Sequence, residues 1–114
     1  MMKKELEKRL IDFFVSICLL YNELKDYYPS KLLLEQLLRS SSSAALNYGE
    51  AQAAESRNDF KHKISIVLKE LRESQINIKM LTEIKQSDQL LKLLTESTEL
   101  VAIFTKTIFS LKNN

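Results

Sequence analysis

Residues 60–81, FKHKISIVLKELRESQINIKML, repeat apolar or small side chains at alternating steps of four and three. The repeating positions are Phe60, Ile64, Val67, Leu71, Ser74, Ile78 and Leu81. Side chains at this spacing lie along one face of an α-helix, and the average step is that of the heptad in packed helical bundles. The stretch therefore predicts a long amphipathic helix with one buried face.

The same spacing occurs three more times. It predicts buried faces made of Leu6, Leu10, Phe13, Ile17, Leu20, Leu24 and Tyr27, of Leu34, Leu37, Ser41, Ala44, Tyr48 and Ala51, and of Leu90, Leu94, Ser97, Val101, Phe104, Ile108 and Leu111. We expect helices over residues 3–28, 30–55, 58–85 and 88–112 of a single domain, 1–114. Because the connections are short, neighbouring helices should run antiparallel. The prediction is an all-α, up-down-up-down, left-handed four-helix bundle.

Turn residues are scarce, which supports this fold class. The 114 residues include one glycine and one proline, whereas sheet-rich folds need turn residues every ~8–12 positions. Pro29 is expected to end the first helix and Ser30 to cap the second. Ser56 or Asn58 should cap the third helix, and Ser87 the fourth.

Gly49 lies inside the second predicted helix, where a glycine costs about 1 kcal/mol relative to alanine. Serines and alanines surround it over residues 40–54. Small residues at this density predict that a neighbouring helix packs closely there. A flexible Ser-rich linker is the alternative, although the heptad spacing continues through the serines.

The residues needed for catalysis or for a metal site are missing. His62 is the only histidine and Cys18 the only cysteine, which excludes a di-iron site, a Cys/His zinc site and a Cys–His nucleophile. One glycine cannot build a phosphate-binding loop. We therefore expect no enzyme, no cofactor and no small-molecule substrate, with His62 on the surface and Cys18 as a buried, inert thiol.

No targeting or membrane segment is expected. Acidic residues such as Glu5 and Glu7 interrupt the start of the chain, unlike a signal peptide, and no apolar run approaches the ~18 residues of a membrane span. The lone cysteine fits a reducing compartment. These features predict a cytoplasmic protein.

Two segments carry a family resemblance. The first contains Ser43, Asn47, Glu50 and Ala51, and the second contains Ser56, Asp59, Phe60, Ser65, Glu70 and Leu71. In these positions the chain resembles the bacterial four-helix bundle proteins encoded in intervening sequences of 23S ribosomal RNA genes. The resemblance spans the middle half of the chain, and the outer helices agree in length and pattern.

The resemblance implies a scaffold more than an activity. Members of the family look like homopentamers around a central channel, and a relative that assists diversity-generating retroelements binds nucleic acid and a reverse transcriptase. Asn47, Glu50 and Glu70 match the polar residues of the family pattern. We interpret them as contacts that fix the register of the second helix against the third, with Lys63 among the candidate partners; contact with a ligand is the alternative.

Basic residues are concentrated in the third helix. The whole chain has a net charge of +2, while residues 57–82 hold six basic and three acidic residues. Arg57, Lys61, Arg72 and Lys79 recur near one side of that helix. Such a row attracts phosphates, so structured RNA, ribosomal RNA included, or DNA is a candidate partner; a solvated helix surface is the alternative.

Apolar residues outside the predicted core indicate self-association. The first helix has Ile11, Phe14, Cys18, Tyr21 and Tyr28, and the third has Ile66, Leu68, Ile76 and Met80. One bundle core cannot bury both sets, so we expect a homo-oligomer, a pentamer by resemblance, with Phe14, Tyr21, Tyr28, Ile66 and Ile76 at its interface. Two functions remain: a module associated with RNA or ribonucleoprotein, and a protein-binding scaffold without a nucleic-acid role.

Overall fold

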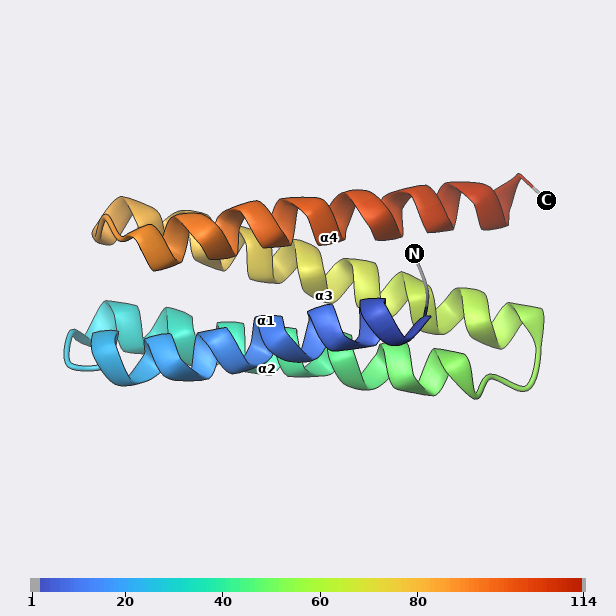
Figure 1. Ribbon diagram of the computed structural model, residues 1–114, viewed down its shortest axis with the longest axis horizontal. Coiled ribbons are helices and arrows are strands. Elements are labelled where there is room, and N and C mark those ends of the chain that lie inside the picture. Colours follow the sequence, from blue (N-terminus) through green and yellow to red (C-terminus); the bar gives the residue numbers. More distant parts are fainter. Residues whose placement is uncertain (1–2, 114) are drawn as a thin grey trace.

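The computed structural model describes residues 3–113 and contains four α-helices. They are α1 (Lys3–Leu24), α2 (Tyr28–Gln52), α3 (Arg57–Ile84) and α4 (Asp88–Lys112). Successive helices run antiparallel and lie side by side in a rod of 46 × 21 × 21 Å (Figure 1). The predicted all-α, up-down-up-down four-helix bundle is therefore confirmed.

The first connection differs from the prediction. Helix α1 ends at Leu24, four residues earlier than expected, and α2 begins at Tyr28. Pro29 lies in the first turn of α2 rather than ending α1, because the first N–H groups of a helix have no partner within it and a proline costs nothing there. Ser30 is consequently buried inside α2, so the prediction that it caps this helix is wrong.

The second and third connections use the predicted caps. Ser56 Oγ accepts a hydrogen bond from the Asp59 backbone N–H at 3.0 Å, and Ser87 Oγ accepts one from Leu90 N–H at 3.4 Å. Helix α2 ends at Gln52, three residues before the predicted end. Ser56 rather than Asn58 is the cap of α3.

The core matches three of the four predicted faces closely. The main exception in the first predicted face is Tyr27, which lies beyond the end of α1 in the connection to α2 and is 59% exposed. In α4 the fully buried face is turned slightly, because Leu93 and Leu100 are buried while Leu94 and Val101 are half-buried. The apolar residues of α4 are dense enough to form two overlapping heptad rows, so spacing alone did not separate them.

Small residues let α2 approach its neighbours, but Gly49 is not one of them. Ser40, Ser41 and Ala44 are fully buried, which agrees with close packing of this segment. Gly49 is exposed, and a Cβ added to it would meet nothing within 4 Å. The expectation that close packing explains this glycine is therefore wrong. The Ser-rich segment is helical throughout and is not a linker.

The helices are not packed equally. Helices α2 and α3 form the most extensive contact, and α1 and α4 the sparsest. The backbones of α1 and α3 do not approach each other closely within residues 3–113, so these two helices occupy opposite corners of the bundle. The side formed by α1 and α4 is consequently the most open one.

Candidate functional site

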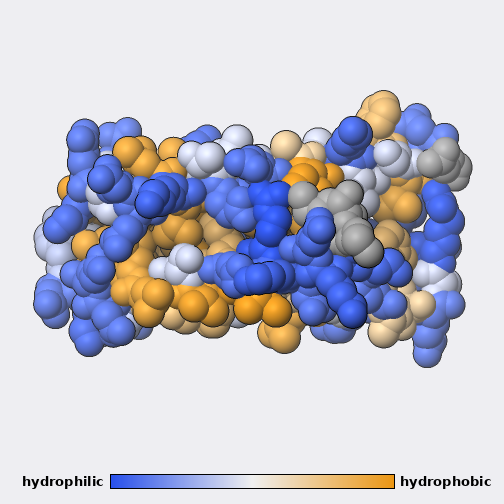
Figure 2. Space-filling model, in the orientation of Figure 1, coloured by the Kyte–Doolittle hydropathy of each residue, from blue (hydrophilic) through white to orange (hydrophobic). Residues whose placement is uncertain are grey.

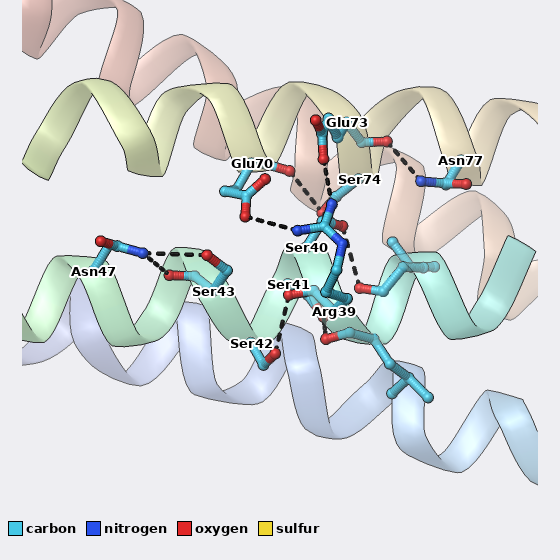
Figure 3. Close-up of polar contacts among 12 residues, drawn as sticks. Arg39, Ser40, Ser41, Ser42, Ser43, Asn47, Glu70, Glu73, Ser74 and Asn77 are labelled. Atoms are coloured by element: carbon cyan, nitrogen blue, oxygen red, sulfur yellow. Dashed lines mark hydrogen bonds and ion pairs between the residues drawn. The ribbon is translucent and has the colours of Figure 1, made fainter.

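A polar cluster joins α2 to α3 near the middle of the rod (Figure 3). Arg39 Nη1 donates a hydrogen bond to Glu70 Oε2 at 3.0 Å, and its second terminal nitrogen donates to Glu73. Glu70 is only 7% exposed, whereas the Arg39 side chain is 59% exposed. The guanidinium thus covers a nearly buried carboxylate from the solvent side.

Opposing influences act on the pKa of Glu70. Burial raises it by disfavouring the charged carboxylate, whereas hydrogen bonds from Ser43 and Arg39 favour the charged form. The hydrogen bonds outweigh burial, so the pKa of Glu70 lies below the usual value of a glutamate. The carboxylate is accordingly charged at neutral pH, as its role in the cluster requires.

Two buried serines meet between the same helices. Ser74 Oγ donates to the Glu70 carbonyl at 2.9 Å, and Ser40 Oγ lies 2.7 Å from Ser74 Oγ. Ser40 Oγ also lies 3.3 Å from the Leu37 carbonyl in its own helix, so either hydroxyl can be the donor in the contact between the two helices. Side chains of this size let the two backbones come close without leaving a buried hydroxyl unsatisfied.

The polar residues of the family pattern have different roles. Glu50 Oε1 accepts a hydrogen bond from Lys63 Nζ at 3.0 Å, across α2 and α3 as the sequence suggested. Asn47 does not reach α3, because its side-chain amide donates to Ser43 in its own helix. Arg39 is the partner that sequence reasoning missed. Antiparallel pairing of Glu50 with Lys63 places Arg39 opposite Ser74, one turn from Glu70, so the register alone brings Arg39 near Glu70 but does not show that the two side chains meet.

One buried amide in this region lacks a complete set of partners. Asn77 is 6% exposed, and its amide nitrogen donates to the Glu73 carbonyl at 3.0 Å. Its Oδ1 atom is buried and accepts no hydrogen bond from the described residues. Asn77 lies beside a shallow hollow between α2 and α3 that also contains Gln36, Ile76 and Met80.

The basic residues predicted to bind nucleic acid lie on the flank of α3 that adjoins α4. Arg57 donates to the Leu111 carbonyl at 3.1 Å, near the end of α4, and Arg72 lines a groove that includes Ile108 of α4. Lys61 and Lys79 are on the same side of α3 by their spacing from Arg57 and Arg72. Lys61 is half-buried, and the other three residues are exposed.

Three of the four basic residues predicted to bind nucleic acid lack ion-pair partners among the described residues. Within residues 3–113, Lys61, Arg72 and Lys79 form no salt bridge, whereas Lys63 pairs with Glu50. The acidic residues of central α3, Glu70 and Glu73, are paired with Arg39 on the opposite flank. Among residues 3–113, these three cations of the α4 flank thus have no carboxylate within ion-pair distance.

The apolar residues predicted for an interface are only partly accessible. Phe14, Tyr21 and Ile66 are half-buried, and Tyr21 packs against the core. Tyr28 is 71% exposed at the start of α2, and Ile76 is 56% exposed on α3. Leu68, which the sequence placed outside the core, is buried within it.

A more continuous apolar row runs along the outer face of α1. It consists of Ile11, Val15 and Leu19, which are 47%, 46% and 65% exposed. Figure 2 shows apolar atoms in a line along this helix, on the face turned to the viewer. Val15 and Leu19 were not predicted as interface residues, although their spacing of four from Ile11 is the signal that identifies them.

A groove opens beside this row, between α1 and α4. Its apolar wall contains Phe13, Leu20 and Leu93, and its polar rim contains Asp12 and Lys92. The hollow is visible in Figure 2 next to the apolar line. Farther along the same side, Arg9 of α1 bridges to Glu96 and Glu99 of α4.

Other groups considered from the sequence lie apart from these features. His62 is on the surface, as expected, and Cys18 is half-buried rather than buried. No three His, Cys, Asp or Glu side chains in residues 3–113 are grouped so that they could hold a metal ion. In the same residues, none of the helices has an apolar stretch long enough to cross a bilayer.

Comparisons with known proteins agree with the bundle architecture. The sequence model of the family described as 23S rRNA-intervening sequence protein matches residues 3–106. Among solved structures, the fold is similar to a protein of unknown function from the S23 ribosomal protein family of Bacteroides thetaiotaomicron, with a TM-score of 0.80. The two sequences are 30% identical, over 90% of this chain and 97% of that one. No curated protein matches the chain significantly.

Proposed function

This chain belongs to the 23S rRNA-intervening sequence protein family, and from that premise we propose that it is a non-enzymatic, self-associating helical bundle that holds structured RNA by its sugar-phosphate backbone. The observation that carries the RNA part is the unneutralised charge of Lys61, Arg72 and Lys79 on one flank of α3. Phosphates are attracted to such a flank without reading base sequence.

Self-association strengthens this proposal. A single copy offers a few cations, which bind a polyanion weakly, whereas several copies repeat the same row and multiply the number of phosphate contacts. The exposed row of Ile11, Val15 and Leu19 supports association, because an apolar row on a helix face is typical of an interface. A pentamer is the state that the family resemblance implies.

A salt titration tests the RNA part. Fluorescence anisotropy with a hairpin from 23S ribosomal RNA should show binding at about 50 mM salt, with an affinity that falls steeply as salt rises. The double variant Lys61→Ala/Lys79→Ala should bind more weakly and reduce the salt slope by about one for each phosphate that the variant no longer neutralises. A DNA duplex of similar length should bind comparably, since backbone contacts do not distinguish bases.

The matched control is Lys31→Ala/Lys106→Ala, which removes two exposed lysines from α2 and α4. It should leave the affinity and the salt slope close to those of the unmodified protein. The RNA proposal is rejected if no binding occurs at low salt, if binding is indifferent to salt, or if the control weakens binding equally.

A protein-binding scaffold with no nucleic-acid role is the second candidate function. Arg57 favours it, because its guanidinium donates to the Leu111 carbonyl near the end of α4 and so serves the fold itself. Light scattering that gives a stable oligomer, together with an RNA titration that gives no signal, would support this function over the first.

A further inference from the structure

One exposed aromatic ring lies at the end of the rod where α4 stops. Phe109 is 68% exposed, whereas Phe104 of the same helix is buried in the core and Ile108 is half-buried. The core at this end therefore forms without the Phe109 ring. The other exposed tyrosine or phenylalanine rings of residues 3–113, Tyr27 and Tyr28, lie at the opposite end of the rod (Figure 1).

The part of α4 that contains Phe109 is basic. Lys112 follows Phe109 by three residues and lies on the same face of the helix. Between Glu99 and the end of α4 at Lys112 the sequence has no acidic residue. Arg57 of α3 donates to the Leu111 carbonyl at 3.1 Å, so its guanidinium also lies at this end of the bundle.

Helix α3 adds a second lysine at the same level. Gln75 Nε2 donates to Thr98 Oγ1 at 3.1 Å, which sets the register of α3 against the antiparallel α4. Lys61 precedes Gln75 by fourteen residues, and Lys112 follows Thr98 by fourteen, so the two lysines lie level with each other. Neither lysine forms a salt bridge within residues 3–113.

The nearest acidic residues of α3 lie on its other flank. Asp59 and Glu70 are eleven residues apart, which is about three helical turns, so they share one side of α3. Glu70 pairs with Arg39 of α2, and that side is therefore the one that adjoins α2. The ring of Phe109 and the lysines beside it thus belong to a surface of one sign of charge.

An aromatic ring bordered by cations is suited to a nucleotide whose base is exposed. The base stacks on the ring, and the phosphates on either side of it pair with the cations. A protein surface that covered Phe109 would also have to compensate Lys61 and Lys112, whereas a nucleic-acid strand supplies the flat ring and the negative charges together.

The basic row of α3 indicates which part of an RNA reaches this ring. From Lys61 to Lys79 the row spans eighteen residues, about 27 Å along the helix. Bases inside a duplex already stack on both sides, so a duplex lying on this row offers a free base only where a strand leaves it. Phe109 lies level with the Lys61 end of the row.

We propose that Phe109 stacks on an unpaired base of a bound RNA, while Lys61 and Lys112 hold the phosphates beside that base. The inference rests on the proposed function and adds the form of the RNA, a duplex with an adjoining single-stranded segment. The contact accepts any base, because every base has a face that can stack.

Two RNA duplexes that differ only in their unpaired bases test the stacking contact. One has a short single-stranded extension of adenosines, and the other has an abasic extension with the same number of phosphates. By fluorescence anisotropy, the unmodified protein should bind the first about 5- to 100-fold more tightly. Phe109→Ala should remove this preference and leave the salt slope unchanged, because no charge is lost.

The matched control is Leu46→Ala. Leu46 is also 68% exposed, but it lies on α2, away from the basic row. Its variant should keep the preference of the unmodified protein for the extension that has bases.

A tryptophan at the same position reports stacking directly. The chain contains no tryptophan, so Phe109→Trp introduces a single fluorophore and keeps an aromatic ring. The duplex with the adenosine extension should quench its fluorescence, whereas the abasic duplex should not. Leu46→Trp should be quenched by neither duplex.

The outcomes separate this inference from the proposed function. Absence of binding to both duplexes at low salt would reject RNA binding itself. Equal binding of the two duplexes by the unmodified protein, or a preference that persists in Phe109→Ala, would reject the stacking contact alone. A lower oligomer mass of Phe109→Ala in light scattering would also overturn it, because the ring would then pack between copies. Circular dichroism establishes that each variant remains helical.

Discussion

At the scale of single residues, Gly49 is a site where the chain gives up stability. It is exposed, it has an ordinary helical backbone without positive φ, and an added Cβ meets nothing within 4 Å. We expect Gly49→Ala to raise the free energy of unfolding by about 0.5–1 kcal/mol, because alanine loses less backbone entropy on folding. Urea denaturation measures the change.

The reverse exchange at an exposed position of α4 is the control. Ala102→Gly should lower the free energy of unfolding by a similar amount, about 1 kcal/mol, for the same reason. If Gly49→Ala is neutral or destabilising while Ala102→Gly behaves as expected, the prediction that Gly49 lowers the stability of the chain is wrong.

Glu70 makes the stability of the bundle depend on acid pH. Its pKa is lower in the folded protein than in the unfolded chain, so its contribution is complete above the unfolded value, about 4.3, and is lost as pH falls through the folded value. Glu70→Gln cannot lose a proton, so this part of the pH dependence should disappear. Urea unfolding at a series of pH values from about 7 to about 3 measures it.

The loss of stability at neutral pH should also differ between Glu70 and Glu73, the two carboxylates of the cluster. At neutral pH, Glu70→Gln should cost about 1.5 kcal/mol, the lower end of the range for a hydrogen bond to a charged group, because its partner Arg39 is exposed to solvent. Glu73→Gln should cost less, because the Glu73 side chain is 41% exposed. An equal acid dependence in the unmodified protein and in Glu70→Gln would contradict the assignment.

At the scale of helices, the start of α2 lacks a side-chain cap. Tyr27 occupies the N-cap position and its side chain makes no capping hydrogen bond, whereas Ser56 caps α3. Tyr27→Asp should raise the free energy of unfolding by about 0.5–1 kcal/mol, since the carboxylate can accept from the Ser30 N–H and lies at the positive end of the helix. Thermal unfolding followed by circular dichroism measures the gain.

Removing an existing cap should instead lower the free energy of unfolding. Ser56→Ala should cost about 1 kcal/mol, and Ser87→Ala should cost less because its capping hydrogen bond is longer, at 3.4 Å. A stabilising Ser56→Ala variant would show that the capping bond contributes nothing to α3.

The helices themselves were predictable because long heptad rows leave little choice of secondary structure. The ends of the helices were less predictable from the sequence. Pro29 can follow one helix or begin the next, and only the packing of Ser30 and Leu34 against the core decides between these options. In α4, the excess of leucines allowed two adjacent buried faces, and contact with α1 and α3 selected the one that includes Leu93 and Leu100.

At the scale of the whole molecule, the uneven packing should appear as uneven protection of backbone amides. Helices α2 and α3 share the most extensive contact, whereas α1 and α4 touch least. Hydrogen exchange should therefore be slowest in central α2 and α3, and faster in α1, because segments with fewer buried contacts open at lower free energy. Mass spectrometry of peptic peptides measures the order.

Hydrogen exchange also tests whether Arg9 stabilises the contact between α1 and α4. Arg9→Met removes the bridge from α1 to Glu96 and Glu99 while keeping a side chain of similar length. Exchange in α1 should accelerate, whereas exchange in the α2–α3 pair should change little. Uniform acceleration in all helices would show that the bundle opens only as one unit.

The candidate surfaces were predictable only where one helix contains them. The basic row of α3 follows from spacing alone, and so does the Glu50–Lys63 pair once the helices are antiparallel. The Arg39–Glu70 contact and the accessibility of Ile11, Val15 and Leu19 depend on how helices are rotated against one another. Rotation is set by side-chain packing throughout the core, which spacing in one helix does not describe.

The paired serines between α2 and α3 limit how this sequence can diverge. Ser74 already bonds its own backbone, and Ser40 also lies 3.3 Å from the Leu37 carbonyl within its own helix. Neither hydroxyl is the reason that the helices approach, because alanine would fit the same space and leave no donor unsatisfied. The constraint is on volume rather than polarity, so related chains can exchange serine and alanine here, whereas a single valine would force the two helices apart.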